Sequence, residues 1–269
     1  MNIKIVTWNM NYWGGGKEYP QPQNERIKAG LNYLKETDID IALLQEFKPE
    51  KYTLLNEGEP PFYISEELED YMIYFRPLPE KGRGWGSAIV LKKDLKIQKK
   101  YSFTNVYEGS PALMCFDISL TDEKTLTVIN AYGANASNPF NKSKFCSTTM
   151  HNILSDITPM VHKKYRKNPF IMLAGDFNVS TQWDELYNDP AHKLVFDRIA
   201  DLGLINCTEK EYGKHVQTHI HSRSKVPWQD DYIFVTEPLQ AVLTNCKVHD
   251  KEAVRHFSDH LPVEIQLTL

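Results

Sequence analysis

Short runs of apolar and β-branched residues, each bounded by turn-forming residues, recur along the whole 269-residue chain. Runs of this length and composition are typical of β-strands, particularly where apolar and polar positions alternate with a period of two. The pattern predicts strands at residues 3–7, 39–44, 72–75, 87–91, 113–120, 125–132, 170–174, 232–235 and 263–269.

Helical spacing interrupts the strand pattern and does not form a block of its own. Apolar residues follow a helical period after Gln23, at Ile27, Leu31 and Leu34, and again in the segment that ends before Pro159. Because strands and helices alternate and several strands are joined by short turn-rich links, we expect a mixed sheet with flanking helices and not an all-parallel sheet.

A third predicted helix has clear start and stop signals at its two ends. Asp189 is expected to be its N-cap, Pro190 lies in its first turn, and Gly203 stops it. Its buried stripe comprises Val195, Ile199 and Leu202. No repeat, low-complexity tract or linker divides the sequence, so the chain is predicted to form one domain over residues 1–269.

The charge balance excludes a protein whose main affinity is a large uniform positive field. Lysine and arginine total 31 against 35 acidic residues, which gives a net charge of −4. Two basic clusters, at residues 92–100 and 162–167, are expected to be solvated surfaces. If nucleic acid binds, its contacts are therefore confined to a local basic or aromatic rim, and binding should depend only shallowly on salt.

The ends of the chain and its cysteines indicate the compartment. Residues 1–8 alternate like a strand and lack the apolar core of a signal peptide, and no apolar run approaches the length of a membrane span. The four cysteines are widely spaced and form no Cys-x-x-Cys pair, so neither a zinc knuckle nor a disulfide scaffold is predicted. We expect a cytoplasmic protein without a membrane span.

Polar residues suited to catalysis or metal binding stand repeatedly where the predicted strands begin or end. Each has an ordinary explanation in turn formation or capping. Strand ends on one edge of an α/β fold converge on a common crevice, however, so residues from distant positions can share one site. These residues are Asn9, Glu46, Tyr132, Asn135, Asp176, Asn178, Asp231, Asp259 and His260.

The ordered set resembles the endonuclease/exonuclease/phosphatase superfamily, whose members share a DNase I-like fold. The matching segments are Thr7-Trp8-Asn9, Leu44-Gln45-Glu46, Asn130-Ala131-Tyr132 with Asn135, Gly175-Asp176-Phe177-Asn178, Asp231-Tyr232 and Ser258-Asp259-His260. They span essentially the whole chain in the family's order. The resemblance implies an α/β fold, namely a four-layer sandwich of two mixed β-sheets packed together with helices outside.

The resemblance also implies a metal site. Glu46 would be the principal carboxylate ligand of a divalent cation, with Asn9 and Asp259 nearby. A few oxygen ligands suit Mg²⁺ or Mn²⁺, which retain waters and accept phosphate oxygens. Tyr132 and Asn135 would stabilise charge on the phosphate or on the leaving oxygen.

The resemblance further implies that a second group of residues positions the attacking water and transfers protons. Asp176 would orient and deprotonate the attacking water or handle the leaving-group proton, and Asn178 would hold that water or a phosphate oxygen. His260 would transfer a proton or donate to the phosphate, with Asp231 fixing its tautomer. Nucleases of the family often carry Asp where this chain has Asn11, so a second metal site is not assured.

Residues near these motifs are candidates for substrate contact. Trp13 and Trp85 could stack on a base or sugar, or could anchor their own loops. Arg83 could contact phosphate, although its flanking glycines equally describe a tight turn. His219, in a His-x-His pair with His221, could face the substrate, and a zinc role is weak because no third ligand follows.

The sequence as a whole predicts a Mg²⁺- or Mn²⁺-dependent phosphodiester hydrolase, with DNA or RNA as its partner. A phosphatase or phosphodiesterase acting on a small-molecule or lipid phosphate, and a non-catalytic binding module on the same scaffold, stay open as alternatives. The Trp-Cys-Asp-Arg segment of inositol polyphosphate 5-phosphatases is absent, because the chain reads Pro227-Trp228-Gln229-Asp230-Asp231.

Overall fold

The computed structural model describes residues 1–13, 23–48, 68–77, 84–103, 113–134, 136–137, 145–220 and 224–269. Arg83 and Asn135 lie outside these ranges, and so does the side chain of Trp13. None of the helices in the described part of the chain is long and apolar enough to cross a lipid bilayer.

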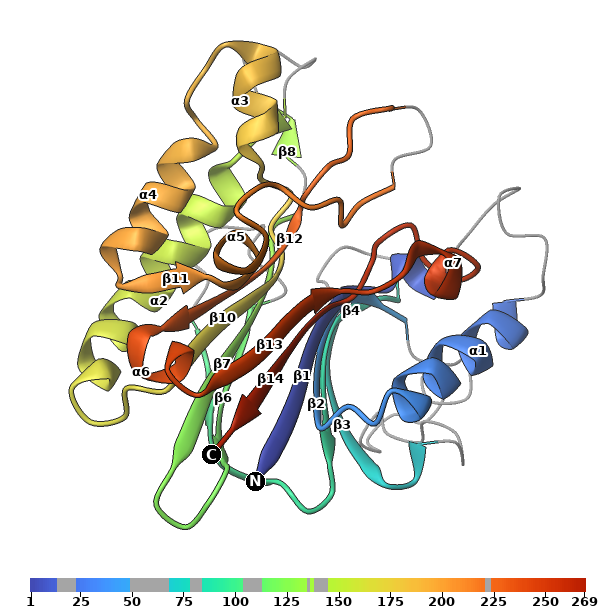
Figure 1. The fold of residues 1–269 in the computed structure, drawn as a ribbon, viewed down its shortest axis with the longest axis vertical. Coiled ribbons are helices and arrows are strands. Elements are labelled where there is room, and N and C mark those ends of the chain that lie inside the picture. Colours follow the sequence, from blue (N-terminus) through green and yellow to red (C-terminus); the bar gives the residue numbers. More distant parts are fainter. Residues whose placement is uncertain are drawn as a thin grey trace.

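Two six-stranded sheets form the centre of the molecule (Figure 1). The first contains β1 (Asn2–Asn9), β2 (Ile41–Phe47), β3 (Tyr71–Pro77), β4 (Gly86–Lys92), β13 (Leu243–Val248) and β14 (Val263–Thr268). The second contains β5 (Lys96–Tyr101), β6 (Met114–Ser119), β7 (Thr125–Tyr132), β10 (Ile171–Asp176), β11 (Leu204–Asn206) and β12 (Asp231–Thr236). A separate pair joins β8 (Ala136–Ser137) and β9 (Phe145–Cys146).

The strand order is β13-β14-β1-β2-β4-β3 in the first sheet and β11-β12-β10-β7-β6-β5 in the second. Each sheet has one parallel pair near its centre, β1 with β2 and β7 with β10, and all other pairs are antiparallel. The prediction of mixed sheets is therefore confirmed. Because parallel neighbours end at the same edge, each sheet brings two strand ends to one rim.

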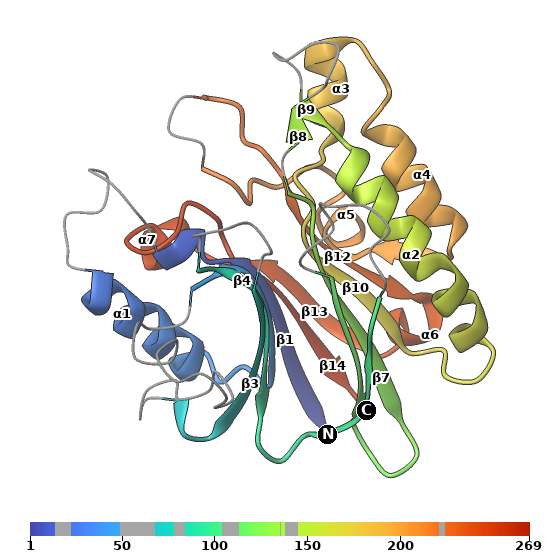
Figure 2. The same ribbon diagram turned by 180° about the vertical axis from the view of Figure 1, so that it is seen from behind.

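The helices of the described residues are α1 (Gln23–Glu36), α2 (Thr148–Tyr165), α3 (Thr181–Tyr187), α4 (Lys193–Asp201), α5 (Cys207–Tyr212), α6 (Glu237–Gln240) and α7 (Lys251–Val254), with a 3₁₀ turn η1 (Asn11–Trp13). Among the helices, α1 covers the outer face of the first sheet, and α2 and α4 cover that of the second, as the two opposite views show (Figures 1 and 2). Ile5, Ile89, Phe116 and Met172 belong to one core between the facing sheets. Further cores lie beneath α1 and beneath α2 and α4, which gives the expected four layers.

In the two six-stranded sheets, the sequence pattern does not predict β5, β11 and β13, which all lie at sheet edges. An edge strand pairs on one side only and tolerates charges, so it lacks a strong apolar alternation. Lys96, Lys99 and Lys100 of β5 are exposed, in keeping with the solvated surface expected for this cluster.

Two helix boundaries differ from the predictions. Asp189 does not cap α4, which begins at Lys193, because the Asp184 carboxylate of the neighbouring α3 accepts the backbone amides of His192 and Lys193 at 2.9 and 2.6 Å. A side chain from another helix thus accepts the backbone hydrogen bonds that a local N-cap residue was expected to accept. In α2, the helix continues through Pro159 to Tyr165.

Gly175 allows β10 to run close beside β7 just before the rim. Its φ is 150°, and a Cβ atom built there would lie 1.8 Å from the carbonyl oxygen of Ala131. A side chain at this position would push the two strands apart, and Asp176 follows directly.

A buried ionic network ties α1 to the first sheet. Glu264 of β14 contacts His249 Nε2 at 3.0 Å and Lys247 Nζ at 3.3 Å, and His249 Nδ1 shares a hydrogen bond with the Tyr33 hydroxyl of α1. Burial raises the pKa of Tyr33 to about 12. Burial would also raise the pKa of the Glu264 carboxyl, but His249 and Lys247 outweigh it and lower the pKa below its ordinary value.

Gly175→Ala should destabilise the fold by about 2–5 kcal/mol, since backbone strain and overpacking add at this position. Gly203→Ala is the matched control: its φ is 73°, but nothing lies within 4 Å of a new Cβ atom. That control should lose only about 1–2 kcal/mol from the left-handed backbone. Urea unfolding measures both, and equal losses would contradict the close approach of β10 to β7.

Glu264→Gln should lower the free energy of unfolding at neutral pH by about 1.5–3 kcal/mol, because it removes a buried charged partner of His249. A carboxyl with a lowered pKa stabilises the fold above its unfolded-state pKa, and this contribution disappears as the pH falls through its folded-state pKa. The difference between wild type and variant should therefore shrink as urea unfolding is repeated towards about pH 4. Glu252→Gln, at a side chain that is 65% exposed, should change stability by less than about 0.5 kcal/mol.

Candidate active site

Asp176, the last residue of β10, lies at the centre of the rim where the strands converge and is only 1% exposed. Its Oδ2 atom accepts hydrogen bonds from Asn9 Nδ2 at 2.8 Å and from Asn178 Nδ2 at 2.9 Å. Its Oδ1 atom accepts the backbone amide of Asn178 at 2.9 Å. Burial, and next the charge of Asp231, raises the pKa of the Asp176 carboxyl well above its ordinary value. The structure thus gathers two of the expected site residues, Asn9 and Asn178, around the buried carboxylate of a third.

His260 and Asp231 form a buried pair beside this carboxylate. His260 Nδ1 lies 2.8 Å from Asp231 Oδ2, so Asp231 holds the proton on Nδ1 and directs Nε2 away from itself. Burial by itself lowers the pKa of the imidazole, but the charge and hydrogen bond of Asp231 raise it well above the usual value. Asp176, Asp231 and His260 each place one atom within 4.8 Å of the others.

The turn before β14 is fixed to the end of β1. Ser258 Oγ donates to the carbonyl of Asn9 at 2.7 Å and accepts the amide of His260 at 3.0 Å. The buried indole of Trp8 donates to the carbonyl of His260 at 2.9 Å. Ser258 therefore supports the turn. Its hydrogen bond to Asn9 and the hydrogen bond from Trp8 to His260 fix the His260 backbone relative to β1.

Glu46 reaches the rim through an irregularity in β2. The pairing of β2 with β4 shifts between Leu44 and Phe47, and Glu46 has a φ of 47°. Such bulges redirect a side chain that a regular strand would place elsewhere. The hydroxyl of Tyr132 donates to Glu46 Oε1 at 2.8 Å, and burial followed by the charge of Glu46 raises the pKa of Tyr132 well above its ordinary value.

Two buried amides beneath the site are functional supports that the sequence reasoning missed. Gln45 Nε2 donates to Asn130 Oδ1 at 2.7 Å and to Thr7 Oγ1 at 3.1 Å. Asn130 Nδ2 donates to the carbonyls of Leu44 and Ala88 at 3.1 and 2.9 Å, so the network crosses from one sheet to the other. A polar residue within an otherwise apolar strand was the available signal.

Trp85 is not open for stacking. It is 6% exposed, and its ring packs against Tyr12 and Tyr132 with centroid separations of 5.0 and 5.9 Å. Its indole therefore packs against Tyr132, in keeping with the anchoring role that the sequence left open beside a substrate contact. Arg83, Asn135 and the side chain of Trp13 lie outside the described residues.

His219 lies within the site, on the outer side of His260. Its Nδ1 atom is 2.9 Å from Asp230 Oδ2, and its Nε2 atom is 3.8 Å from Asp259 Oδ2. His219, Asp259 and His260 form a second group with one atom each within 4.8 Å of the others.

The chemistry of the rim fits a divalent cation. Several carboxylates lie close together in the site. One oxygen each of Asp230, Asp231 and Asp259 is buried without a hydrogen-bond partner among the described residues. A cation bound by oxygen and imidazole ligands would offset this charge. Neither three-residue group contains Glu46, and the oxygen of Asn9 accepts the amide of Asn11 at 2.8 Å. The expected set of Glu46, Asn9 and Asp259 thus stays a prediction.

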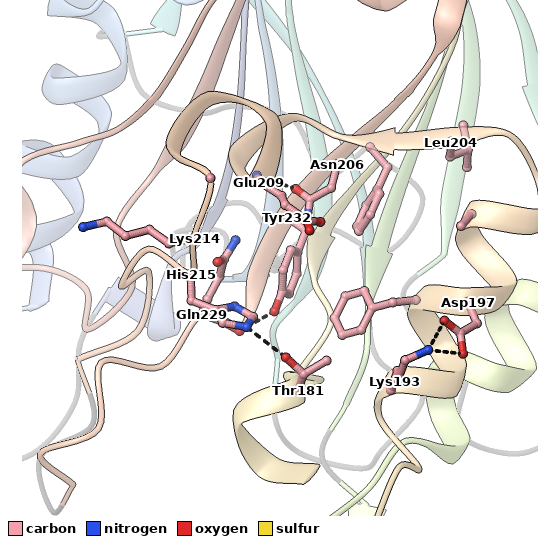
Figure 3. A pocket seen from close by; sticks show the side chains of 14 residues that line it. Thr181, Lys193, Asp197, Leu204, Asn206, Glu209, Lys214, His215, Gln229 and Tyr232 are labelled. Carbon is pink, nitrogen blue, oxygen red and sulfur yellow. Dashed lines mark hydrogen bonds and ion pairs between the residues drawn. The ribbon is translucent and has the colours of Figure 1, made fainter. Parts of the chain in front are cut away.

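A cavity of about 520 Å³ lies on the opposite face of β12 and does not belong to this cluster (Figure 3). Tyr232, which follows Asp231 and therefore points to the other face of the strand, lines it together with Phe196, Phe234 and His215. Thr181 Oγ1 lies 2.9 Å from His215 Nε2 across its edge. The cavity is thus separated from Asp231 by the strand itself.

Known proteins resemble the chain over nearly its full length. It is 23% identical to the exodeoxyribonuclease of Bacillus subtilis (strain 168), with 99% of this chain and 100% of that protein covered. An AP endonuclease from Archaeoglobus fulgidus superposes with a TM-score of 0.68 at 22% identity, covering 99% of this chain and 100% of that one. A 3′ phosphatase from Neisseria bound to a product DNA hairpin gives 0.69 at 19% identity, covering 99% and 100%.

The structural likenesses confirm the DNase I-like fold that the sequence resemblance implies. The model of the Endonuclease/Exonuclease/phosphatase family matches residues 6–260, which include every segment quoted for that resemblance. The described residues of these motifs lie at one rim, so the match in sequence coincides with one cluster in space. The chain belongs to the Endonuclease/Exonuclease/phosphatase family.

Proposed function

We propose that this protein is a divalent-metal-dependent nuclease that cleaves DNA phosphodiester bonds. The observation that carries the proposal is the buried Asp176 carboxylate, held by Asn9 and Asn178 beside the Asp231–His260 pair. A phosphodiester anion repels a nucleophile, so a hydrolase must combine cationic charge, an oriented water and a route for the leaving proton. The rim cluster offers residues for each task.

DNA is favoured over other phosphoesters by the kinds of protein that the chain resembles. Those named above are an exodeoxyribonuclease, an AP endonuclease and a 3′ phosphatase bound to DNA. We take RNA and small phosphoesters as competing substrates that the same site chemistry would admit. Residues 1–269 are taken as one domain, since β1 lies between β14 and β2 in a single sheet.

Asp176 is assigned to the attacking water. Burial makes its carboxylate a stronger base, and the amides of Asn9 and Asn178 leave it little freedom to rotate. A bound Mg²⁺ or Mn²⁺ would supply Lewis-acid stabilisation of the phosphate oxygens. Asp259 and Glu46 are the carboxylates proposed to hold that ion, with Asn9 beside them.

His260 is assigned to the phosphate and to the leaving oxygen. The Asp231 hydrogen bond fixes its tautomer, and the raised pKa of its imidazole favours the protonated form that donates. The Tyr132 hydroxyl holds Glu46 and stays protonated, because burial and Glu46 raise its pKa. Asn178 is assigned to hold either the water or a phosphate oxygen.

Asp176→Asn should lower the rate of hydrolysis by about 10²- to 10⁴-fold, the usual contribution of a positioned general base.

Glu46→Gln should lower the rate and raise the Mg²⁺ concentration required for activity, because an amide is a weaker cation ligand. Rates are measured on single-stranded, duplex and abasic DNA, on RNA and on small phosphodiesters, with Mg²⁺, Mn²⁺ or EDTA.

Matched controls are Asp197→Asn and Glu252→Gln, which make the same chemical changes at exposed surface ion pairs. Both should retain wild-type rates. Hydrolysis without EDTA sensitivity, or wild-type rates in both site variants, would refute the metal-dependent mechanism. If activity is confined to RNA or to small phosphoesters, that class and not DNA is the substrate. No turnover on any substrate would favour a non-catalytic binding module.

A further inference from the structure

The segment from Thr218 to Ile220 joins the two loops that carry the catalytic pair. Thr218 and His219 donate their amides to the carbonyl of Trp228 at 2.9 and 3.0 Å. On its other side, Ile220 donates to the carbonyl of Asp259 at 2.8 Å, and Leu261 donates to the carbonyl of Thr218 at 2.6 Å. The backbone of His219 is therefore held from both sides.

The side chain of His219 is held by an aspartate in the same way as that of His260. Asp231 holds His260 through Nδ1 at 2.8 Å, and the adjacent Asp230 holds His219 through Nδ1 at 2.9 Å. Thr218 Oγ1 accepts the amides of both aspartates at 3.0 Å, which aligns the start of β12. Two carboxylate–imidazole pairs thus stand side by side.

The two imidazole rings are stacked. Their centroids lie 4.3 Å apart, and the angle between their planes is 8°. Asp231 restrains one edge of the His260 ring, but a hydrogen bond at a single atom tolerates tilting of the ring about that bond. A flat ring packed against the face of His260 opposes such tilting. Because Asp230 fixes the orientation of His219, the restraint passes from Asp230 through His219 to His260.

We propose that His219 and Asp230 are positioning residues that fix the plane of the His260 imidazole by stacking. This inference rests on the proposed hydrolase function of the same site and adds a role for two residues. His219 acts through His260, with its ring packed against one face of that imidazole. It also faces Asp259, since its Nε2 atom lies 3.8 Å from Asp259 Oδ2.

Three variants separate stacking from hydrogen bonding. His219→Ala removes the ring, His219→Phe keeps a flat ring without nitrogen atoms, and Asp230→Asn keeps a side chain of similar shape but removes the charge. His215→Ala is the matched control, because His215 is exposed at the cavity on the far face of β12. Thermal unfolding checks that each variant folds, and kcat and KM are then measured with Mg²⁺ on the best DNA substrate.

His219→Ala should lower kcat by about 10- to 100-fold, the cost typical of losing an outer supporting contact, with KM changed by less than about threefold. His219→Phe should recover most of that loss, and Asp230→Asn should fall between the two. His215→Ala should match wild type. A His219→Ala kcat within about twofold of wild type overturns the proposal. A His219→Phe variant as slow as His219→Ala also overturns it, because the nitrogen atoms and not the ring would then matter.

A readout without turnover keeps this inference separate from the proposed nuclease activity. Side-chain NMR of the His260 imidazole should show shifted ring resonances in His219→Ala, since a stacked ring alters the magnetic environment of its neighbour, and His219→Phe should retain ring-current shifts in the wild-type sense. If wild type shows no EDTA-sensitive hydrolysis, the proposed function fails while these shifts still decide the stacking role. Unchanged His260 resonances in His219→Ala would overturn the inference even in an active enzyme.

Discussion

The burial of several carboxylates in one place is the constraint on which the rest of the site depends. Asp176, Asp230 and Asp231 are each at most 3% exposed, and an unpaired buried charge is too costly to persist. The carboxylates are paired with the side-chain amides of Asn9 and Asn178 and with the imidazoles of His260 and His219. Since these partners come from distant parts of the sequence, their strands must end at one rim for the carboxylates to be tolerated.

The sheets are joined beneath that rim by polar contacts as well as by apolar packing. Gln45 and Asn130 bridge the two sheets through hydrogen bonds of 2.7 to 3.1 Å. Directional contacts of this kind fix the relative position of the sheets more narrowly than apolar surfaces do, because an unmatched buried amide is costly. The bulge at Glu46 and the close approach at Gly175 then adjust where individual side chains emerge.

Central strands and edge strands differed in how well the sequence predicted them. The central strands bury both faces, so their apolar runs were visible without the structure. Three of the four edge strands, β5, β11 and β13, were not, because an edge strand pairs on one side only and tolerates charged residues. Asp184 shows the same limit for helix ends: it caps α4 from another helix, and no local pattern around Asp189 could reveal that.

The sequence by itself determined the mixed α/β architecture, the family and the order of the polar residues at the strand ends, because burial period and local motif are properties of neighbouring residues. Only the tertiary structure decided which of those residues meet. It placed Trp85 against Tyr132 as an anchor and stacked His219 on His260. Contacts of this kind depend on sheet register, bulges and packing between segments far apart in the chain, so they follow from the fold and not from the local sequence.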